Sequence, residues 1–255
     1  MMNSGDVFLP VGAPVPDWRP KARATDVMLR GSECLLEPLS PMHHADALCA
    51  AYGQALDGRD WTYLSVGPFA DAPALRAYLE RIAVQTDPRH FAVVDLCTGQ
   101  AVGTLALMRE QAEHGVIEVG FVAFSPALQR SRIATEAHFL LMTYVFETLG
   151  YRRYEWKCDS CNQRSRNAAE RLGFQYEGMF RQAAIYKSRN RDTAWFSLLD
   201  SEWPVAKAAF LHWLHPQNFN THGVQISRLQ FIRERIASSG WGLEGGEATL
   251  LRGLP

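Results

Sequence analysis

The sequence predicts a mixed α/β domain, of the α+β type, with a mostly antiparallel central sheet and helices packed against it. Apolar residues recur at helical spacing in some segments and alternate in others, so both element types are expected. Three strand-like segments, 90–95, 101–109 and 115–124, follow one another with short turns between them, which favours antiparallel neighbours. The stretch 121–137 then predicts a strand, a charged turn and the start of a long helix.

Composition bounds the possible functions. The 255 residues are 47% apolar, which is enough for a core, and 26 basic against 27 acidic residues give a net charge of -1. This balance argues against nucleic acid or a membrane as a partner and leaves small neutral or anionic ligands open. No signal peptide or membrane-spanning run is recognisable, and five cysteines at irregular spacing fit a reducing compartment. We therefore expect a cytoplasmic protein.

The chain divides into three parts. Residues 1–30 are proline-rich and predict an extended arm, with Trp18 as its anchor on the domain. Residues 31–215 predict one domain, and residues 216–255 a C-terminal extension with a possible helix at 224–237. Besides the three strands already named, the domain is expected to contain strands 33–39 and 153–158, helices 41–52, 71–86, 133–149, 163–172 and 201–215, and a hairpin of 174–187 and 192–200 with its turn at 188–191.

An anion site is expected where the strand ending near Phe124 delivers the chain to the next helix. Unpaired backbone N–H groups and the positive end of the helix dipole converge at such a point. Arg130 and Arg132 add charge there, which suits a pyrophosphate. In the same strand Val116, Glu118, Gly120 and Val122 are expected on one face, so Glu118 is a carboxylate in an otherwise apolar strand.

The element order resembles the GNAT superfamily of acyl-CoA-dependent N-acyltransferases, over about Gly31 to His215. The segment 129–137, QRSRIATEA, is similar to the family's Q/R-x-x-G-x-G/A loop. The segment 162–174, NQRSRNAAERLGF, is similar to the N-x-x-S-x-x-x-A…L-G-F motif of the branch that includes the ribosomal-protein N-terminal acetyltransferases. The opening LEPL at 36–39 and Arg191-Asp192 also suit that branch. The resemblance implies a sheet with two splayed strands and an acetyl-CoA site between them.

The resemblance implies which residues hold the cofactor. The strand end, the loop and the second motif would contribute Phe121, Val122, Ala123, Gln129, Arg130, Ser131, Arg132, Ile133, Ala134, Thr135, Asn162, Ser165 and Asn167. One position departs from the family pattern, because Arg132 stands where the first glycine is usual. Glycine lets the backbone approach the pyrophosphate without a Cβ in the way, so Arg132 could alter the cofactor site.

Two residues are candidates for the chemistry. Acyl transfer from a thioester needs a neutral amine and a protonated leaving thiolate. An α-amine, with a pKa near ~8, needs less help than a lysine at about 10.4. Glu118 is the candidate base, and the alternative is a surface or salt-bridged strand glutamate without a catalytic role. A backbone N–H near Val122 or Ala123 would polarise the carbonyl oxygen. Ser165 lies where this branch has a serine proposed to protonate the thiolate. The alternative is that Ser165 is only a local hydrogen-bond donor or helix cap.

The remaining candidates concern the acceptor pocket, alternative proton donors and metal binding. The resemblance implies that Trp61, Tyr63, Glu118, Arg181 and Tyr186 line the acceptor pocket, although aromatic residues near loops are often simply packed. Tyr144 and Tyr176 compete with Ser165 as proton donors, but their pattern favours the core. Cys158 and Cys161 have C-x-x-C spacing without a second pair, and His43-His44 has no ligand partners and is expected to be solvated, so no metal is expected.

The sequence thus predicts an acetyl-CoA-dependent N-acetyltransferase that acts by direct transfer in a ternary complex. The acceptor is a primary amine: a protein or peptide N-terminus, an amino acid or an amine-bearing antibiotic. A larger acyl group such as succinyl is an alternative that Arg130, Arg132 or Arg181 would suit. A second hypothesis is an acyl-CoA-binding sensor without catalysis, whose terminal extensions could cover the site or form a homodimer. A redox or zinc module is the third.

Overall fold

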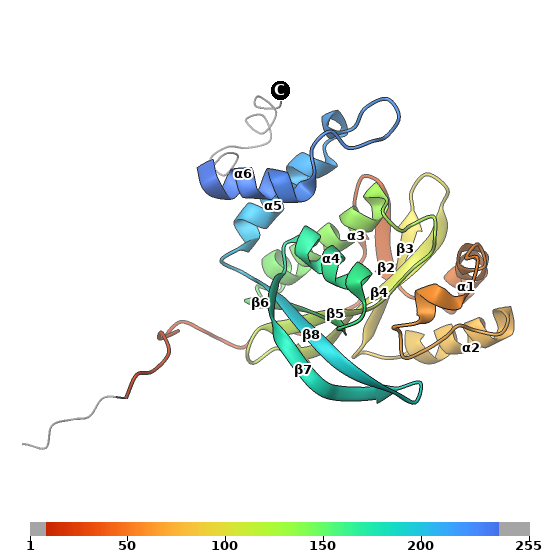
Figure 1. Cartoon of the computed structure of the whole chain (residues 1–255), viewed down its shortest axis with the longest axis horizontal. Coiled ribbons are helices and arrows are strands. Elements are labelled where there is room, and N and C mark those ends of the chain that lie inside the picture. Colours follow the sequence, from red (N-terminus) through yellow and green to blue (C-terminus); the bar gives the residue numbers. More distant parts are fainter. Residues whose placement is uncertain (1–8, 240–255) are drawn as a thin grey trace, which may run out of the picture.

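The computed structural model describes residues 9–239 and confirms the mixed α/β fold with a mostly antiparallel sheet (Figure 1). Its eight strands are ordered β1-β2-β3-β4-β5-β6-β8-β7, and among them β5 and β6 are the parallel neighbours. The strands are β1 (Leu29–Arg30), β2 (Cys34–Pro38), β3 (Arg89–Asp95), β4 (Gln100–Gln111), β5 (Val116–Phe124), β6 (Arg153–Asp159), β7 (Gln175–Tyr186) and β8 (Arg189–Leu199).

Helices cover both faces of this sheet. The α-helices are α1 (Pro41–Tyr52), α2 (Ala72–Ala83), α3 (Arg132–Thr143), α4 (Gln163–Leu172), α5 (Trp203–Leu214) and α6 (Leu229–Ser239). Short turns of helix are η1 (Gly58–Trp61), η2 (Tyr144–Thr148) and η3 (Pro216–Asn218). Figure 1 shows α1 and α2 side by side at one end, with α5 and α6 together on the far side of α3.

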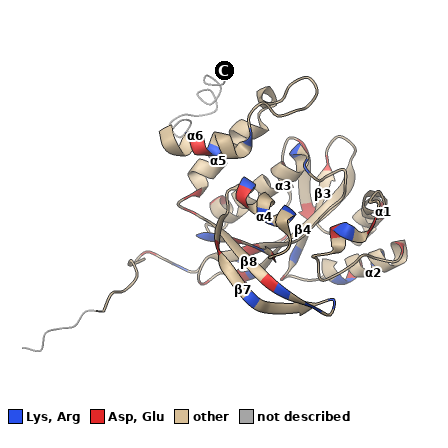
Figure 2. Cartoon of the chain, in the orientation of Figure 1, with Lys and Arg blue, Asp and Glu red and all other residues tan. Residues whose placement is uncertain are grey.

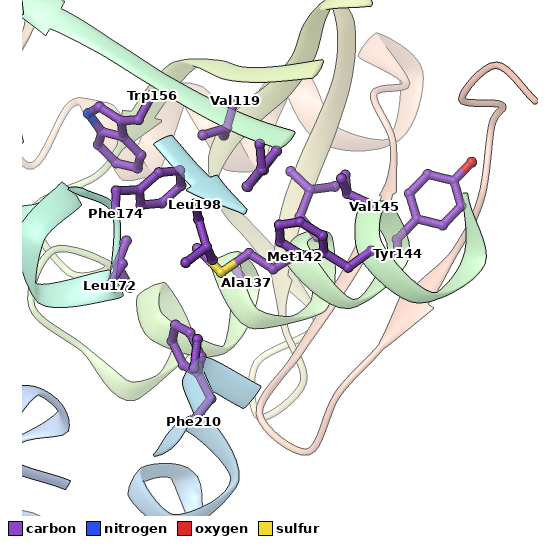
Figure 3. Packing of buried hydrophobic residues seen from close by; sticks show 14 of the residues in the cluster. Val119, Ala137, Met142, Tyr144, Val145, Trp156, Leu172, Phe174, Leu198 and Phe210 are labelled. Carbon is purple, nitrogen blue, oxygen red and sulfur yellow. The ribbon is translucent and has the colours of Figure 1, made fainter. Parts of the chain in front are cut away.

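The larger core lies between the sheet and the helices α3, α5 and α6. Every second residue of the strands enters it, as the period of a strand requires: Ile117 and Val119 from β5, and Tyr154 and Trp156 from β6. Figure 3 shows Met142 and Ala137 of α3 facing Val119 and Leu198 across this layer. The expected common face of Tyr154 and Trp156 is therefore confirmed.

A smaller core lies on the opposite face, where α1 and α2 cover β3 and β4. Leu48 of α1 and Leu79 of α2 are buried there against Ala92 and Val94. Asp71 caps α2 as expected, since its side chain accepts a hydrogen bond from Ala74 N at 2.8 Å. Beyond this layer the end of β5 at 120–124 is partly exposed, and Ala123 and Phe124 line a cavity with Asp60 and Trp61 of η1.

A bulge in β5 places Val122 on the opposite face of the strand from the one predicted. The pairing of β4 with β5 shifts between Thr104 and Ala106, and Phe121 has a positive φ of 47°. The extra residue reverses the alternation, so Ala123 pairs with Thr104 while Val122 packs against the larger core. The expectation that Val122 shares the face of Glu118 is wrong, because alternation holds only while the ladder is regular.

The parallel pairing of β5 with β6 is short. It joins Val116–Val119 to Arg153–Trp156, and beyond Val119 the described sheet records no further β5–β6 pairs, whereas β6 continues to pair with β8 through Asp159. The backbone groups of 120–124 that face β6 therefore lack a strand partner on that side. The two strands separate beside the bulge, as the resemblance implied.

Three element boundaries differ from expectation. The β7–β8 turn consists of Lys187 and Ser188, with φ of 49° and 58°, so the expected turn at 188–191 is wrong and Arg189 already belongs to β8. Such a two-residue turn with both φ positive matches the twist of a hairpin. The helix from Arg132 changes to a π-helical turn at Tyr144. In the extension α6 begins at Leu229 rather than at residue 224.

The N-terminal segment contacts the domain at several points. The Trp18 indole donates a hydrogen bond to Glu113 O at 2.8 Å, and its ring lies so close to Gly115 that a Cβ there would collide with it. Leu29 and Arg30 form β1 and pair with β2, although residues 1–30 were predicted to be an extended arm. Across residues 9–239 no helix is both long and apolar enough to cross a membrane.

A buried carboxylate fixes the start of α3 to the β1–β2 turn. Glu136, which is 4% exposed, accepts hydrogen bonds from the backbone N–H groups of Ser32, Glu33 and Cys34 at 2.7–2.8 Å. A Cβ at Gly31 would collide with this carboxylate, so a residue without a side chain is needed there. The contact sets where the N-terminus of α3 lies relative to the sheet.

Candidate active site

The loop between β5 and α3 presents backbone donors at the start of the helix. Ser131 is the N-cap, and its Oγ accepts from Ala134 N at 3.0 Å. The amides of Arg132 and Ile133, in the first helical turn, have no partner within the helix. Arg130 precedes the cap in a left-handed conformation, φ 60°, and is exposed. The backbone geometry that the predicted anion site requires is therefore present, and anion binding there stays a prediction.

Arg132 does not obstruct this loop. Its guanidinium pairs with Glu33 at 2.8 Å, donates to Leu214 O at 3.4 Å and lies 4.3 Å from the centre of the Phe219 ring. These partners belong to the β1–β2 turn and the C-terminal region. Arg132 is also the first residue of α3, so its position does not require the positive φ that glycine permits. The substitution therefore ties the loop to the extension and leaves the backbone donors in place.

The start of α4 supplies polar groups on the other side of the strand separation. Asn162 is the N-cap of α4, and its Oδ1 accepts from Ser165 N at 3.0 Å, which leaves the amide NH₂ as a donor. Ser165 Oγ accepts from Trp156 Nε1 at 3.0 Å, and its hydroxyl also interacts with the Cys158 side chain, where its hydrogen bond opposes the rise that burial causes in the Cys158 pKa. Asn167, by contrast, is exposed and accepts from Gln163 Nε2.

Glu118 is buried at the last paired stretch of β5, with 5% of its surface exposed. Lys157 Nζ lies 2.9 Å from its carboxylate, and Arg109 Nε lies 3.5 Å away. Burial raises the pKa of Glu118, and the charge and hydrogen bond of Lys157 oppose that rise. Glu118 is therefore an ion-paired strand carboxylate whose acidity is perturbed by burial. The salt-bridged interpretation is confirmed, and the catalytic role stays a prediction.

Lys157 is the centre of a charge cluster that sequence reasoning missed. Its Nζ also lies 2.7 Å from Glu155 and 3.7 Å from the centre of the Trp195 ring, and its side chain is 6% exposed. Arg153 bonds to Glu155 from the other side. A signal was present, because the charges of 153, 155 and 157 alternate with the apolar residues of the same strand.

The acceptor side is hollowed next to the bulge. Two small adjoining cavities share Tyr52, Trp61, Leu64 and Ala123 in their walls. The Tyr52 hydroxyl donates to Ala123 O at 2.9 Å, which binds the end of α1 to the strand beyond the bulge. Burial raises the pKa of Tyr52, so the phenol remains protonated. The walls are mainly apolar.

The residues predicted for the acceptor pocket are dispersed. Trp61 is buried and lines both cavities, whereas Tyr63 donates to Cys161 O at 3.2 Å at the start of α4. Tyr186 donates to Asp159 Oδ2 at 2.8 Å, an interaction that helps to raise its pKa, after burial, to about 12. Arg181 is exposed on β7 and lines neither cavity.

Four site residues were not found from the sequence: Tyr52, Asp60, Lys157 and Arg164. Tyr52 was assigned only to the apolar stripe of its helix. Asp60 lines one of the cavities, and Arg164 Nη1 lies 3.2 Å from its carboxylate. Asp60 lies outside the motifs and Arg164 occupies an unspecified position of N-x-x-S, so only the fold brings them together.

Two remaining expectations fail. Tyr176, expected in the core, is 49% exposed, because β7 is the outermost strand and one side of it faces solvent. His44, expected to be solvated, is 4% exposed, and its ring lies 2.6 Å from the Glu37 carboxylate. Tyr144 is buried as expected, and its hydroxyl accepts from Thr25 N. Within residues 9–239 no three metal-ligating side chains cluster.

Comparisons with known proteins agree with this architecture. Residues 34–175 match the family model described as an acetyltransferase (GNAT) domain. A GCN5-related N-acetyltransferase from Brucella melitensis is 44% identical, with a TM-score of 0.85 over 86% of this chain and 100% of that one. The chain is 28% identical to "Uncharacterized N-acetyltransferase p20" of Bacillus licheniformis, over 64% of this chain and 90% of the relative.

A third relative bears on the branch. The protein named "Putative ribosomal N-acetyltransferase YdaF" of Bacillus subtilis (strain 168) is 30% identical, over 44% of this chain and 61% of its own length. Together these matches show that the chain belongs to the GNAT acetyltransferase family. It is an acyltransferase, and the family's reaction is acyl transfer to an amine.

Proposed function

We propose that the protein transfers an acetyl group from acetyl-CoA to a primary amine in a ternary complex. The observation that carries this proposal is the end of β5–β6 pairing after Val119 and Trp156, with Glu118 and the bulge on one side of the gap and Asn162 and Ser165 on the other. A gap lined by unpaired backbone groups is what the peptide-like arm of CoA requires.

The residues of this chain fit acetyl-CoA at both ends of the gap. The amides at the start of α3, with Arg130 beside them, would hold the pyrophosphate through charge-assisted hydrogen bonds. The side-chain NH₂ of Asn162 and the β6-facing edge of β5 would hold the amide arm. When bound, acetyl-CoA supplies the activated acetyl group and a thiolate leaving group.

Glu118 would take the proton of the amine, directly or through a water molecule. Burial makes the carboxylate more basic than an exposed glutamate, and the charge and hydrogen bond of Lys157 oppose that rise in its pKa. An α-amine is the acceptor best suited to such a base, because it is already partly neutral near neutral pH. The printed name of the Bacillus subtilis relative supports a protein N-terminus as one acceptor to test.

The bulge and Ser165 would complete the transfer. A backbone N–H group near Val122 or Ala123 would polarise the thioester carbonyl. The Ser165 hydroxyl, with Trp156 donating to its oxygen, would give its proton to the leaving thiolate. Burial raises the pKa of Cys158, and the resulting protonated thiol argues against a covalent acyl-enzyme at this cysteine.

The test combines binding with turnover. Acetyl-CoA binding is measured by calorimetry, and thiol release is followed with peptides, amino acids and aminoglycosides as acceptors. We expect Glu118→Gln to lower kcat by about 10²- to 10⁴-fold, and Ser165→Ala to lower it as well, with acetyl-CoA affinity retained. Glu80→Gln, which removes an exposed carboxylate of α2, is the matched control. No acetyl-CoA binding, or full turnover by Glu118→Gln, would refute the assignment.

The same assay separates the alternatives. A succinyl carboxylate would need a free cation near the thioester, but Arg132 is engaged by Glu33 and Arg181 lies outside the cavities. We therefore expect turnover with acetyl-CoA to exceed that with succinyl-CoA. A sensor without catalysis would bind acetyl-CoA and release no thiol with any amine, and Arg132 no longer supports that hypothesis.

A further inference from the structure

Arg164 joins the two sides of the site. Its Nη1 lies 3.2 Å from Asp60 Oδ1 of η1, and its Nη2 donates to Gln129 Oε1 of the loop before α3. Gln129 in turn donates through Nε2 to Phe124 O at 3.0 Å, at the end of β5. One guanidinium thus connects α4, the acceptor side and the predicted phosphate loop.

This connection crosses the gap proposed for acyl-CoA. Gln129 follows β5 and Arg164 follows β6, and these two strands are unpaired beyond Val119 and Trp156. A ligand that enters between the strands and reaches the start of α3 must pass the contact between Arg164 and Gln129. The contact therefore has to change when such a ligand binds.

The Arg164 side chain is able to change partners. It is 62% exposed, so its ion pair with Asp60 is worth little in water. A phosphate group offers a guanidinium two parallel charge-assisted hydrogen bonds, which a single contact with a carboxylate oxygen does not. Gln129, which Arg164 already contacts, is the first residue of the loop that precedes the open N-terminus of α3.

Asp60 has a second place in the structure. Asp60 lines a cavity otherwise formed by Tyr52, Ala55, Trp61, Leu64 and residues 123–126, and among these described lining residues it is the one with a carboxylate. Arg164 partly neutralises it in the ligand-free protein. If Arg164 leaves, η1 loses one of the contacts that hold it against α4.

We propose that Arg164 binds a phosphate group of acyl-CoA. In the ligand-free protein the Arg164 guanidinium is instead paired with Asp60. This inference rests on the proposed function and deepens it. Binding of acyl-CoA moves the guanidinium from Asp60 and Gln129 to the phosphate oxygens, which releases η1 beside the acceptor cavity. Acyl-CoA binding and the acceptor side are thereby coupled through one side chain.

The proposal predicts opposite effects for the two partners of the ion pair. Arg164→Gln should weaken acetyl-CoA binding about 10-fold or more, because a charge-assisted bond to phosphate is lost. Asp60→Asn should tighten it by about 2- to 5-fold, because the competing partner is removed. Both are measured by calorimetry with acetyl-CoA, so no acceptor has to be known.

A second ligand and two control variants isolate the phosphate. S-acetylpantetheine lacks the phosphates, and its affinity should be the same for wild type and Arg164→Gln. Arg59 and Asp57 form a more exposed ion pair in the same turn, with side chains 71% and 46% exposed. Arg59→Gln and Asp57→Asn therefore change the same charges away from the gap and should leave acetyl-CoA binding unchanged.

The outcomes are distinct. Opposite shifts for the two variants, seen with acetyl-CoA and absent for the controls, support the proposal. Unchanged affinity in Arg164→Gln, or weaker binding in Asp60→Asn, overturns it while the proposed acetyltransferase function stands. A wild-type protein that does not bind acetyl-CoA refutes both.

Discussion

The two faces of β5 and β6 differ in how they are stabilised. Toward α3 the strands present Ile117, Val119, Tyr154 and Trp156, which are buried in the larger core. Toward the opposite side they present Glu118, Glu155 and Lys157, which are also buried but ion-paired, and Figure 2 shows that charged positions recur along the neighbouring β7 and β8. Alternate residues of the same strands therefore serve stability and chemistry separately.

The difference shows what each face can tolerate. Apolar packing depends on volume and hardly on pH, since hydrophobic burial involves no charge. The charged face depends on pairing, because an unpaired buried charge costs more than the pair contributes. Glu118 can be buried, and so made more basic, only because Lys157 accompanies it.

The largest stability effect is expected on the apolar face. Phe196 of β8 pairs with Trp156 and is 0% exposed. Phe196→Ala should lower the free energy of unfolding by about 3–5 kcal/mol, through lost burial and the remaining cavity. Urea unfolding at pH 7.5 and pH 5 measures it, and the loss should be similar at both. A strongly pH-dependent loss would contradict the comparison.

A slightly smaller but pH-dependent effect is expected on the charged face. Lys157→Met removes the cation between Glu118 and Glu155 and should cost about 3 kcal/mol at pH 7.5. The cost should shrink toward acid pH, because the two carboxyl groups can then be protonated.

Activity gives this variant a second readout. Without Lys157 the pKa of Glu118 rises further, so the acid limb of the kcat/KM profile should shift to higher pH. Glu118 must be ionised to act as a base, so activity is lost as pH falls through its pKa. An unshifted acid limb would show that Glu118 is not the titrating group. Arg109→Gln, which removes the more distant and 60% exposed partner, should shift the limb less.

The smallest expected effect concerns a polar exception within the apolar face. His138 of α3 is 4% exposed between the rings of Phe124 and Trp156, and among residues 9–239 its Nδ1 has no hydrogen-bond partner. Burial lowers its pKa to about 3. The unfolded chain, with a histidine pKa near ~6.5, binds more protons between these values, so stability is fully present above about pH 6.5 and falls as the pH drops.

Removal of this histidine should flatten that dependence. Between pH 6 and pH 4, His138→Leu should reduce the loss of unfolding free energy by about 1.4 kcal/mol per pH unit relative to wild type. His90, whose pKa burial lowers to about 4, remains as a second source of acid sensitivity. Chemical denaturation across this pH range measures the difference, and parallel curves for both proteins would refute the burial argument.

Much of the fold could be predicted because local patterns and the tertiary structure agree. The helix stripes, the cap at Asp71 and the short turns between β3, β4 and β5 all depend on residues close in sequence. The prediction failed where one residue changes a register. The bulge at Phe121 places Val122 on the other face of β5. The hairpin turn lies at Lys187-Ser188 rather than at 188–191. At Phe121, Lys187 and Ser188 the positive φ is adopted without a glycine, the residue that would have indicated it in the sequence.

The candidate site was predictable to the extent that a motif carried it. The loop at 129–134 and the Asn162–Ser165 segment lie on either side of the gap, and Glu118 is buried beside it. Lys157, Asp60 and Arg164 were not predicted, because a charged residue in a strand or at a helix start is most often solvated. Glu118, which pairs with Lys157, and Asp60, which pairs with Arg164, are distant in sequence from these partners.

The sequence by itself determined the order of the elements, the alternation that separates the two faces of β5 and β6, and the family of the chain, because these depend on local periodicity and on motifs. Only the tertiary structure decided that Arg132 turns toward Glu33 and that Lys157 neutralises Glu118. A single side chain can point in several directions from the same backbone, and burial and charge contributed by distant segments select one of them.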